Sequence, residues 1–337
     1  MMEVWSVVAV IAFALAPWVP VWRISDRYLK EARNTWLLAT LGVAAVWLAT
    51  VEPMFAFVAL GLMIRWRSHR LLPSLVTWSA IAGMWFAMQA MPREFLRWLP
   101  YAWLAAGACQ GLLLFDEWMD DRRVGGTIGQ RTLTGAYCAL VFPFAIEPSW
   151  ATGAIPFLLL GLLITCSWLA FVALFAGLAV LEPWTIPGIA ALVGAAYVAY
   201  RTKLLEKLPR GDTLDTFWQR WDTARLLVHH GRRWPLWLAG RGPYNVIYDI
   251  MRWDSRYKAT LIHGHAHNEP LEFVYEYGLC GALALVAFVV RVAPHLRVGD
   301  PWTAAAVIGG VTLLGSIGTR VVPFGVVWWA IVGGMTR

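Results

Sequence analysis

The sequence contains few charged residues and only four cysteines. Only 15% of its 337 residues are charged, whereas a soluble globular domain has about 25%. This shortage excludes an ordinary water-soluble globular protein. The four cysteines form no Cys-x-x-Cys pair, so neither a disulfide framework nor a thiolate metal site is indicated. No basic run stands apart from the apolar blocks, and nucleic acid is therefore not an expected partner.

Apolar residues take the place of the missing charge. The sequence is 59% hydrophobic and contains 22 tryptophans. Its apolar blocks have about the length needed to cross a hydrocarbon core roughly 30 Å thick. They predict an all-α polytopic integral membrane protein with about 10–12 transmembrane helices, of which 36–64 and 151–182 could each be one long helix. The candidate spans are 4–22, 36–51, 53–64, 72–91, 99–115, 134–146, 151–166, 168–182, 185–200, 273–293, 302–318 and 322–335.

One long stretch departs from this pattern. Residues 201–272 hold 12 of the 28 Lys and Arg, 8 of the 21 acids and five of the seven histidines. They predict a large extramembrane loop with short helices, between N-terminal transmembrane helices (1–200) and C-terminal ones (273–337). The acidic 116–121 segment and the basic residues after 290 favour placing this loop on the outer side. A long polar segment in an apolar chain is where a functional site is expected.

The densest polar cluster lies at the end of this loop. Asn268, Glu269 and Pro270 predict a helix that begins near residue 269, so His267 stands just before its N-terminus. The positive end of the helix dipole disfavours imidazolium, and a neutral His267 can act as a general base. The free N–H groups of the same helix end also suit a phosphate oxygen. Glu269 and Glu272 oppose both effects.

Two other interpretations of these histidines stay open. On an extended segment His263, His265 and His267 share one face, and three imidazoles can hold a catalytic zinc. Alternatively, His267 and Asn268 only cap a helix. A metal-free role for His267 is the favoured hypothesis, because no second cluster of metal ligands stands out in the sequence.

Arginines in the loop are candidate partners for phosphate. Gly240 and Gly242 flank Arg241 and allow a tight turn that directs the guanidinium into a cleft. Upstream, 218–225 is typical of an interfacial amphipathic helix whose Arg220 and Arg225 bind lipid phosphates or solvate the polar face.

In order and spacing, these segments resemble the O-antigen ligase and polymerase superfamily of bacterial envelope glycosyltransferases. The strongest element is His267-Asn268, nine residues, then Gly278-x-x-Gly281, which is similar to the ligases' His-Asn-x9-Gly-x-x-Gly pattern. The 240–243 turn, the helix around Trp221 and the 126–129 segment before a mid-chain helix follow the family's order. The resemblance covers roughly 126–335.

The sequence departs from the family at three positions. The family often has Ser-Arg between the spans of the 151–182 block, whereas this sequence has Ser167-Trp168. The Asn that follows the 126–129 segment is replaced, which leaves Arg131 nearby. The Arg expected four residues before Trp221 is Phe217.

The resemblance implies a metal-independent, inverting glycosyltransferase that needs no cofactor. Its donor would be a glycan on undecaprenyl pyrophosphate, its acceptor a sugar hydroxyl such as that of lipid A core, and its surroundings the lipids of the bacterial inner membrane, with the site facing the periplasm. His267 would be the catalytic base. The expected substrate-binding residues are Asn268, Glu272, Arg241, Arg131, Arg220, Arg225 and Tyr244, and the structural glycines are Gly240, Gly242, Gly278 and Gly281.

Alternatives to a ligase remain. A polymerase that joins repeat units would use the same donor with another acceptor. A membrane transporter would need charged residues inside its spans or helices broken in symmetric halves. A protein that keeps the fold without the chemistry is a further alternative, which Trp168 and Phe217 favour.

Overall fold

A computed structural model describes residues 52–64, 71–120, 131–146, 151–165, 167–185, 187, 223–225, 227–229, 236–242, 268–316 and 322–337. Every regular element among these residues is a helix, and they contain no strand. The all-α part of the prediction is therefore confirmed. The chain divides into two compact units, which are described separately.

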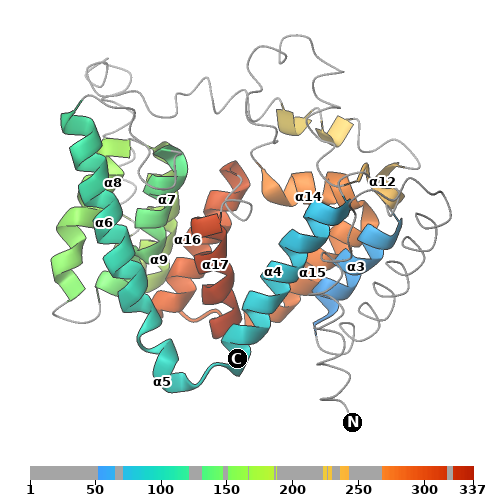
Figure 1. Cartoon of the computed structure of the whole chain (residues 1–337), viewed down its shortest axis with the longest axis horizontal. Coiled ribbons are helices and arrows are strands. Elements are labelled where there is room, and N and C mark those ends of the chain that lie inside the picture. The colour runs from blue at the N-terminus through green and yellow to red at the C-terminus, as the bar shows by residue number, and fades with distance from the viewer. Residues whose placement is uncertain are drawn as a thin grey trace, which may run out of the picture. The chain divides into compact units, whose positions relative to one another are not determined.

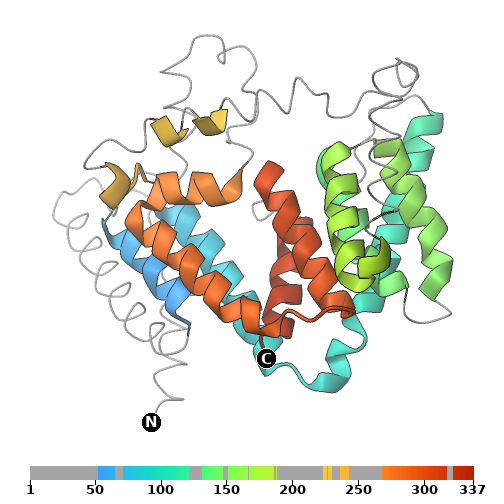
Figure 2. The same ribbon diagram turned by 180° about the vertical axis from the view of Figure 1, so that it is seen from behind.

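The first unit comprises residues up to 83, 222–266 and 270–291. Phe273 and Tyr277 recur at helical spacing and anchor their helix in the core, where the Trp78 Nε1–H donates to the Tyr277 hydroxyl at 3.0 Å. The core also takes Val58, Leu62, Leu75 and Ala284 from three other helices. Figures 1 and 2 show its last two helices, α14 (Glu269–Tyr277) and α15 (Leu279–Val292), meeting at a sharp corner. The helices are α3 (Pro53–Ile64), the first part of α4 (Leu71–Ala90), α12 (Leu236–Ala239), α14 (Glu269–Tyr277) and α15 (Leu279–Val292).

The second unit comprises 84–221, 267–269 and 292–337. Helix α7 (Arg131–Val141) is its central element, because it contacts α6, α8, α9 and α16 and buries Leu133 and Leu140 completely. Figure 2 shows α16 beside α9. The other elements are α5 (Arg93–Leu96), α6 (Leu99–Met119), η3 (Phe142–Ala145), η4 (Ala151–Ala154), α8 (Ile155–Thr165), α9 (Trp168–Leu181), η5 (Pro183–Thr185), η8 (Ala293–His295), α16 (Pro301–Gly315) and α17 (Val322–Met335).

Short polar caps set the starts of two apolar helices. The Ser167 hydroxyl accepts a hydrogen bond from the Ala170 N–H at 3.3 Å, and α9 begins directly after it. The Asp300 carboxylate accepts from the Thr303 N–H at 2.8 Å, with Pro301 in the first turn of α16. The apolar block at 151–182 is therefore two helices, since α8 ends at Thr165.

The prediction of 10–12 transmembrane helices is wrong. None of the described helices is both long enough and apolar enough to cross a membrane, a distance that needs about 20 apolar residues. The most apolar helices, α8, α9 and α17, have 11, 14 and 14 residues. Helices α4 and α6 have 20 and 21 residues and carry polar residues near their C-terminal ends, such as Gln89 and Asp116. The expectation of a multi-pass protein of the bacterial inner membrane is wrong for the same reason.

Candidate functional site

The turn at 240–242 is bonded to the last turn of α14. The Arg241 N–H donates to the Tyr275 carbonyl at 2.9 Å, and the Gly242 N–H donates to the Glu276 carbonyl at 2.8 Å. The last four carbonyls of a helix have no partner within the helix. The turn supplies donors to two of them, so a segment that follows α12 caps a helix distant in sequence.

Gly240 and Gly278 pack backbone against backbone in this cap. Their φ angles are +67° and +62°, in the left-handed region that favours glycine. A Cβ on Gly240 would lie 2.6 Å from the Gly278 nitrogen, and a Cβ on Gly278 would lie 2.5 Å from the Leu238 carbonyl oxygen. No side chain fits at either position. The structure thus brings together two glycines from separate sequence motifs.

Helix α14 carries a buried acidic face. Glu269, Glu272 and Glu276 recur at helical spacing and are 8%, 1% and 1% exposed. Burial of a carboxylate is costly without partners, and none of the three is without an interaction. The 240–242 turn holds Arg241 half-buried at the end of this helix, with its Nε shielded from solvent. A guanidinium and buried carboxylates therefore belong to one rigid corner, which we call the α14 corner (236–242 and 270–281).

Asn268 precedes α14, and α14 begins at Glu269 as the sequence predicts. The Asn268 Nδ2 donates to the Leu314 carbonyl at 3.1 Å, in the last turn of α16. This hydrogen bond joins Asn268 to the end of another helix. A role in orienting a histidine or an acceptor stays a prediction.

The remaining predicted residues fall into three groups. Gly281 lies in α15 where a Cβ would be 2.8 Å from the Phe273 carbonyl oxygen, so the close approach of the helices requires a small residue. Arg131 is the first residue of α7, and Arg225 is exposed in the short helical stretch 223–225. Outside the described residues lie His267, Arg220, Tyr244, His263 and His265.

No cluster of three or more His, Cys, Asp or Glu within the described ranges is arranged to hold a metal. The three-histidine zinc hypothesis concerns 263–267, which is outside them. A thiolate nucleophile is disfavoured at Cys138, because burial raises the pKa of this thiol to about 12 and keeps it protonated at neutral pH.

The structure adds Glu276 to the candidate residues that the sequence indicates. Glu276 is as buried as Glu272 and lies one turn further along α14. The i, i+4 spacing of the two acids was the available signal. At the position where the ligase family has an arginine, Trp168 is 42% exposed in the first turn of α9, so this position supplies no cation.

Neither a protein-family model nor a curated protein nor a solved structure matches this chain.

Proposed function

We propose that the protein is an O-antigen ligase-like, inverting glycosyltransferase. It moves a glycan from undecaprenyl pyrophosphate to an acceptor sugar hydroxyl such as that of lipid A core. The observation that carries the proposal is the α14 corner, in which the backbone of the Arg241 turn bonds directly to the helix that carries Glu272. The residue that binds the phosphate and the residue that positions the acceptor need a fixed geometry relative to each other.

The reaction follows from the groups assigned to it. The acceptor oxygen attacks the anomeric carbon, the bond from that carbon to the pyrophosphate oxygen breaks, and the configuration inverts. His267 takes the proton of the acceptor hydroxyl. The leaving pyrophosphate keeps the bonding electron pair, and arginines stabilise its growing negative charge.

Arg241 is the arginine assigned to the leaving group. The N–H groups of Arg241 and Gly242 both donate hydrogen bonds to α14, so the backbone that carries the Arg241 side chain is held in place. Arg131, Arg220 and Arg225 are further candidates for the pyrophosphate, and Tyr244 follows Arg241 in the same sequence motif. A preorganised guanidinium stabilises a leaving phosphate without a metal ion.

Glu272 and Asn268 are assigned to positioning. A carboxylate or amide that accepts a hydrogen bond from an imidazole N–H fixes the ring tautomer and leaves the other nitrogen free to accept a proton. Glu272 is buried on a helix whose neighbouring face is anchored in the core by Phe273 and Tyr277. A rigid carboxylate of this kind suits positioning better than proton transfer.

Exposed apolar side chains are consistent with a lipid-linked donor. In α15, Leu283, Val286 and Val290 are 38%, 59% and 67% exposed and share one face. A hydrocarbon carrier supplies the kind of surface that such side chains pack against.

The test is glycan transfer in vitro from undecaprenyl-pyrophosphate glycan to lipid A core, with and without EDTA. We expect His267→Ala to lower the rate by a factor of roughly 10²–10⁴, the usual contribution of a general base. His295→Ala, in η8, is the matched control and should keep the wild-type rate. Wild-type activity in His267→Ala would contradict the base assignment, and loss of activity in EDTA would contradict a metal-free mechanism.

Two further comparisons sharpen the assignment. Arg241→Lys retains the charge but loses the fork of donors, so the rate should fall less than in Arg241→Ala. A second carrier-linked glycan offered as acceptor separates the two reactions of the superfamily. Preference for that acceptor over lipid A core would identify a polymerase.

A further inference from the structure

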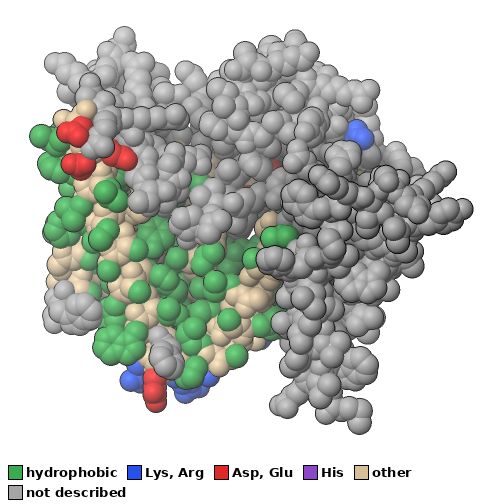
Figure 3. All heavy atoms as spheres, viewed as in Figure 1, with side chains coloured by type: hydrophobic (Ala, Val, Ile, Leu, Met, Phe, Trp, Pro, Cys, Tyr) green, Lys and Arg blue, Asp and Glu red, His purple; other side chains and the backbone are tan. Residues whose placement is uncertain are grey.

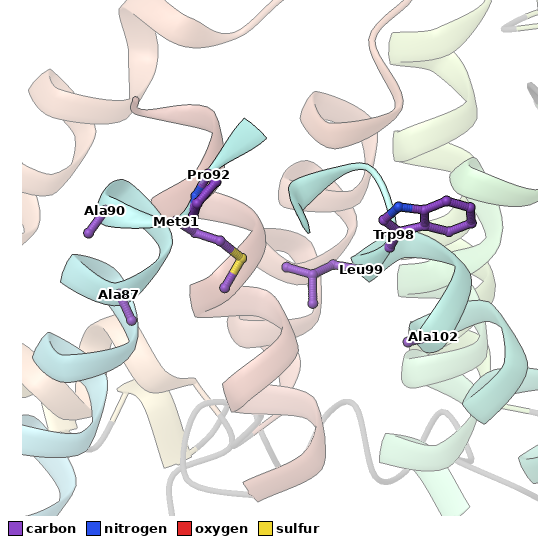
Figure 4. A pocket seen from close by; sticks show the side chains of 7 residues that line it. All are labelled: Ala87, Ala90, Met91, Pro92, Trp98, Leu99 and Ala102. Carbon is purple, nitrogen blue, oxygen red and sulfur yellow. The ribbon is translucent and has the colours of Figure 1, made fainter. Parts of the chain in front are cut away.

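An open apolar groove lies in the second unit, at the turn from α4 through α5 to α6. Its volume is about 550 Å³, within the range of small-molecule sites. Figure 4 shows Met91 and Leu99 projecting toward the same space from either side of the turn. No ionisable side chain lines it. The lining residues of this corner groove are Ala87, Ala90, Met91, Pro92, Trp98, Leu99 and Ala102.

Cationic side chains stand next to the corner groove. Arg93 and Arg97 are exposed on and beside α5, between the lining residues Pro92 and Trp98, and Glu94 is the one acid among them. The Arg337 guanidinium donates to the carbonyl of the lining residue Met91. Figure 3 shows basic side chains on both sides of an acidic one, next to apolar side chains, where Figure 1 places α5. The three arginines and one glutamate leave a net positive rim.

Trp98 lies at the junction of rim and groove. It is 68% exposed, and its ring packs edge-on against Tyr101 with centroids 5.8 Å apart. An exposed indole beside arginines is typical of side chains that sit at the level of lipid headgroups. The wall is therefore apolar, the rim cationic, and the boundary between them aromatic.

We propose that the corner groove binds one fatty-acyl chain of an anionic phospholipid, whose phosphate meets Arg93 and Arg97. The groove is open and its lining is apolar, which suits a hydrocarbon chain. Guanidinium groups pair with phosphate in a bidentate geometry. This lipid site is separate from the proposed transferase chemistry and does not depend on it.

The test is photo-crosslinking of the full chain in neutral-detergent micelles. The probe is phosphatidylglycerol with a diazirine on a palmitoyl chain, and phosphatidylcholine with the same chain is the comparison. We expect phosphatidylglycerol to label the peptide 87–102 in preference to phosphatidylcholine. Each arginine near a lipid phosphate favours the anionic lipid by roughly fivefold, so Arg93→Gln combined with Arg97→Gln should remove most of that preference.

Substitutions in the wall test the acyl chain itself. Ala87→Asp places a charge in the apolar lining and should lower labelling at least about tenfold. Ala80→Asp, at an exposed alanine two turns earlier on α4 and outside the lining, is the matched control. Ala90→Phe fills the groove without adding charge and should also reduce labelling, which covers the case that Ala87→Asp fails to fold.

Three results would overturn the proposal: labels mapped outside 87–102, equal labelling by both lipids, or equal loss in Ala80→Asp and Ala87→Asp. Transfer activity that depends on His267 is measured separately, so failure of either proposal is distinguishable from failure of the other.

Discussion

Helices α14 and α15 meet at Gly278, yet they distribute polarity in opposite ways. In α14, Glu272 and Glu276 are each 1% exposed. In α15, Val286 and Val290 are 59% and 67% exposed. Carboxylates are rarely buried without partners. A single exposed valine is common on a protein surface, whereas a row of exposed apolar side chains on one helix face is less common.

The contrast shows that partners, more than residue type, decide burial at this corner. The apolar residues of α14 anchor the helix in the core, which carries the acids on the same short helix into the interior. Helix α15 needs only one apolar face for that core and supplies it with Ala284 and Leu285. Its other apolar face is left at the surface. The acidic face is therefore the buried side of the corner, and the valine face is the exposed side.

The largest effect is expected from Gly278→Ala, which acts on the joint between the two helices. The new Cβ would meet the Leu238 backbone, and φ of +62° is strained for alanine. Overpacking costs about 1–3 kcal/mol and a left-handed alanine about 1–2 kcal/mol. We expect the free energy of unfolding to fall by about 2–5 kcal/mol in denaturant titrations.

Gly310→Ala provides the control for this substitution. A Cβ on Gly310, inside α16, would have no neighbour within 4 Å, so alanine should stabilise the helix by about 0.5–1 kcal/mol. Equal stabilities of the two variants would contradict the packing of Gly278 against α12.

Arg291→Ala tests the far end of α15. The Arg291 Nε lies 3.2 Å from Glu52 Oε1, and Glu52 is 1% exposed at the start of α3. Each charge also interacts favourably with the helix dipole, because Glu52 lies at the positive end of α3 and Arg291 at the negative end of α15. Loss of the partner of a buried carboxylate costs about 3–5 kcal/mol, and partial exposure of Arg291 reduces this to about 1–3 kcal/mol.

Arg291→Lys is the matched control, because it keeps the charge and should recover part of the stability. The measurement is again the free energy of unfolding. A stability of Arg291→Ala equal to that of the wild type would show that the ion pair does not hold α15 against α3.

A smaller effect is expected from the buried face of α15 at high pH. Burial raises the pKa of the Cys280 thiol above its ordinary value of 9.0. The contribution of the neutral thiol is complete below that value and is lost as the pH rises through the folded-state pKa. Stability should therefore decline more steeply above pH 9 in the wild type than in Cys280→Ala. Parallel pH curves for the two proteins would contradict the burial of this thiol.

The same thiol allows the two faces of α15 to be compared by labelling. Val286→Cys places a second thiol on the exposed face, and it should react with a maleimide faster than Cys280 at pH 8, because only exposed thiols with an accessible thiolate react readily. Peptide mapping assigns the two sites. Faster labelling of Cys280 would reverse the assignment of faces.

Local features of this corner were predictable from sequence, and long-range ones were not. Asn268, Glu269 and Pro270 fix the start of α14 through short-range backbone preferences. The 240–242 turn follows from its two glycines. The contact of Gly240 with Gly278 depends on the tertiary fold, which no local pattern encodes.

The transmembrane prediction failed for a related reason. Apolar composition gives the length of a block but does not show where the helix inside it ends. Ser167 interrupts one block by capping α9, and α16 ends at Gly315, inside the apolar block expected over 302–318. The burial of Glu276 was equally hidden, because a helical face becomes an interior face only through its neighbours.

The smallest effect is expected from Val286→Gln, which tests whether the exposed valine face supports the fold. Val286 is 59% exposed, so the substitution should change the free energy of unfolding by no more than about 0.5 kcal/mol. Ala284→Gln, on the buried face of the same helix at 3% exposure, is the control and should be strongly destabilising through overpacking. A large loss in Val286→Gln would mean that this face is part of the core. A small loss of stability, together with weaker binding of a hydrocarbon-linked donor, would show that the valine face binds the donor and does not stabilise the fold.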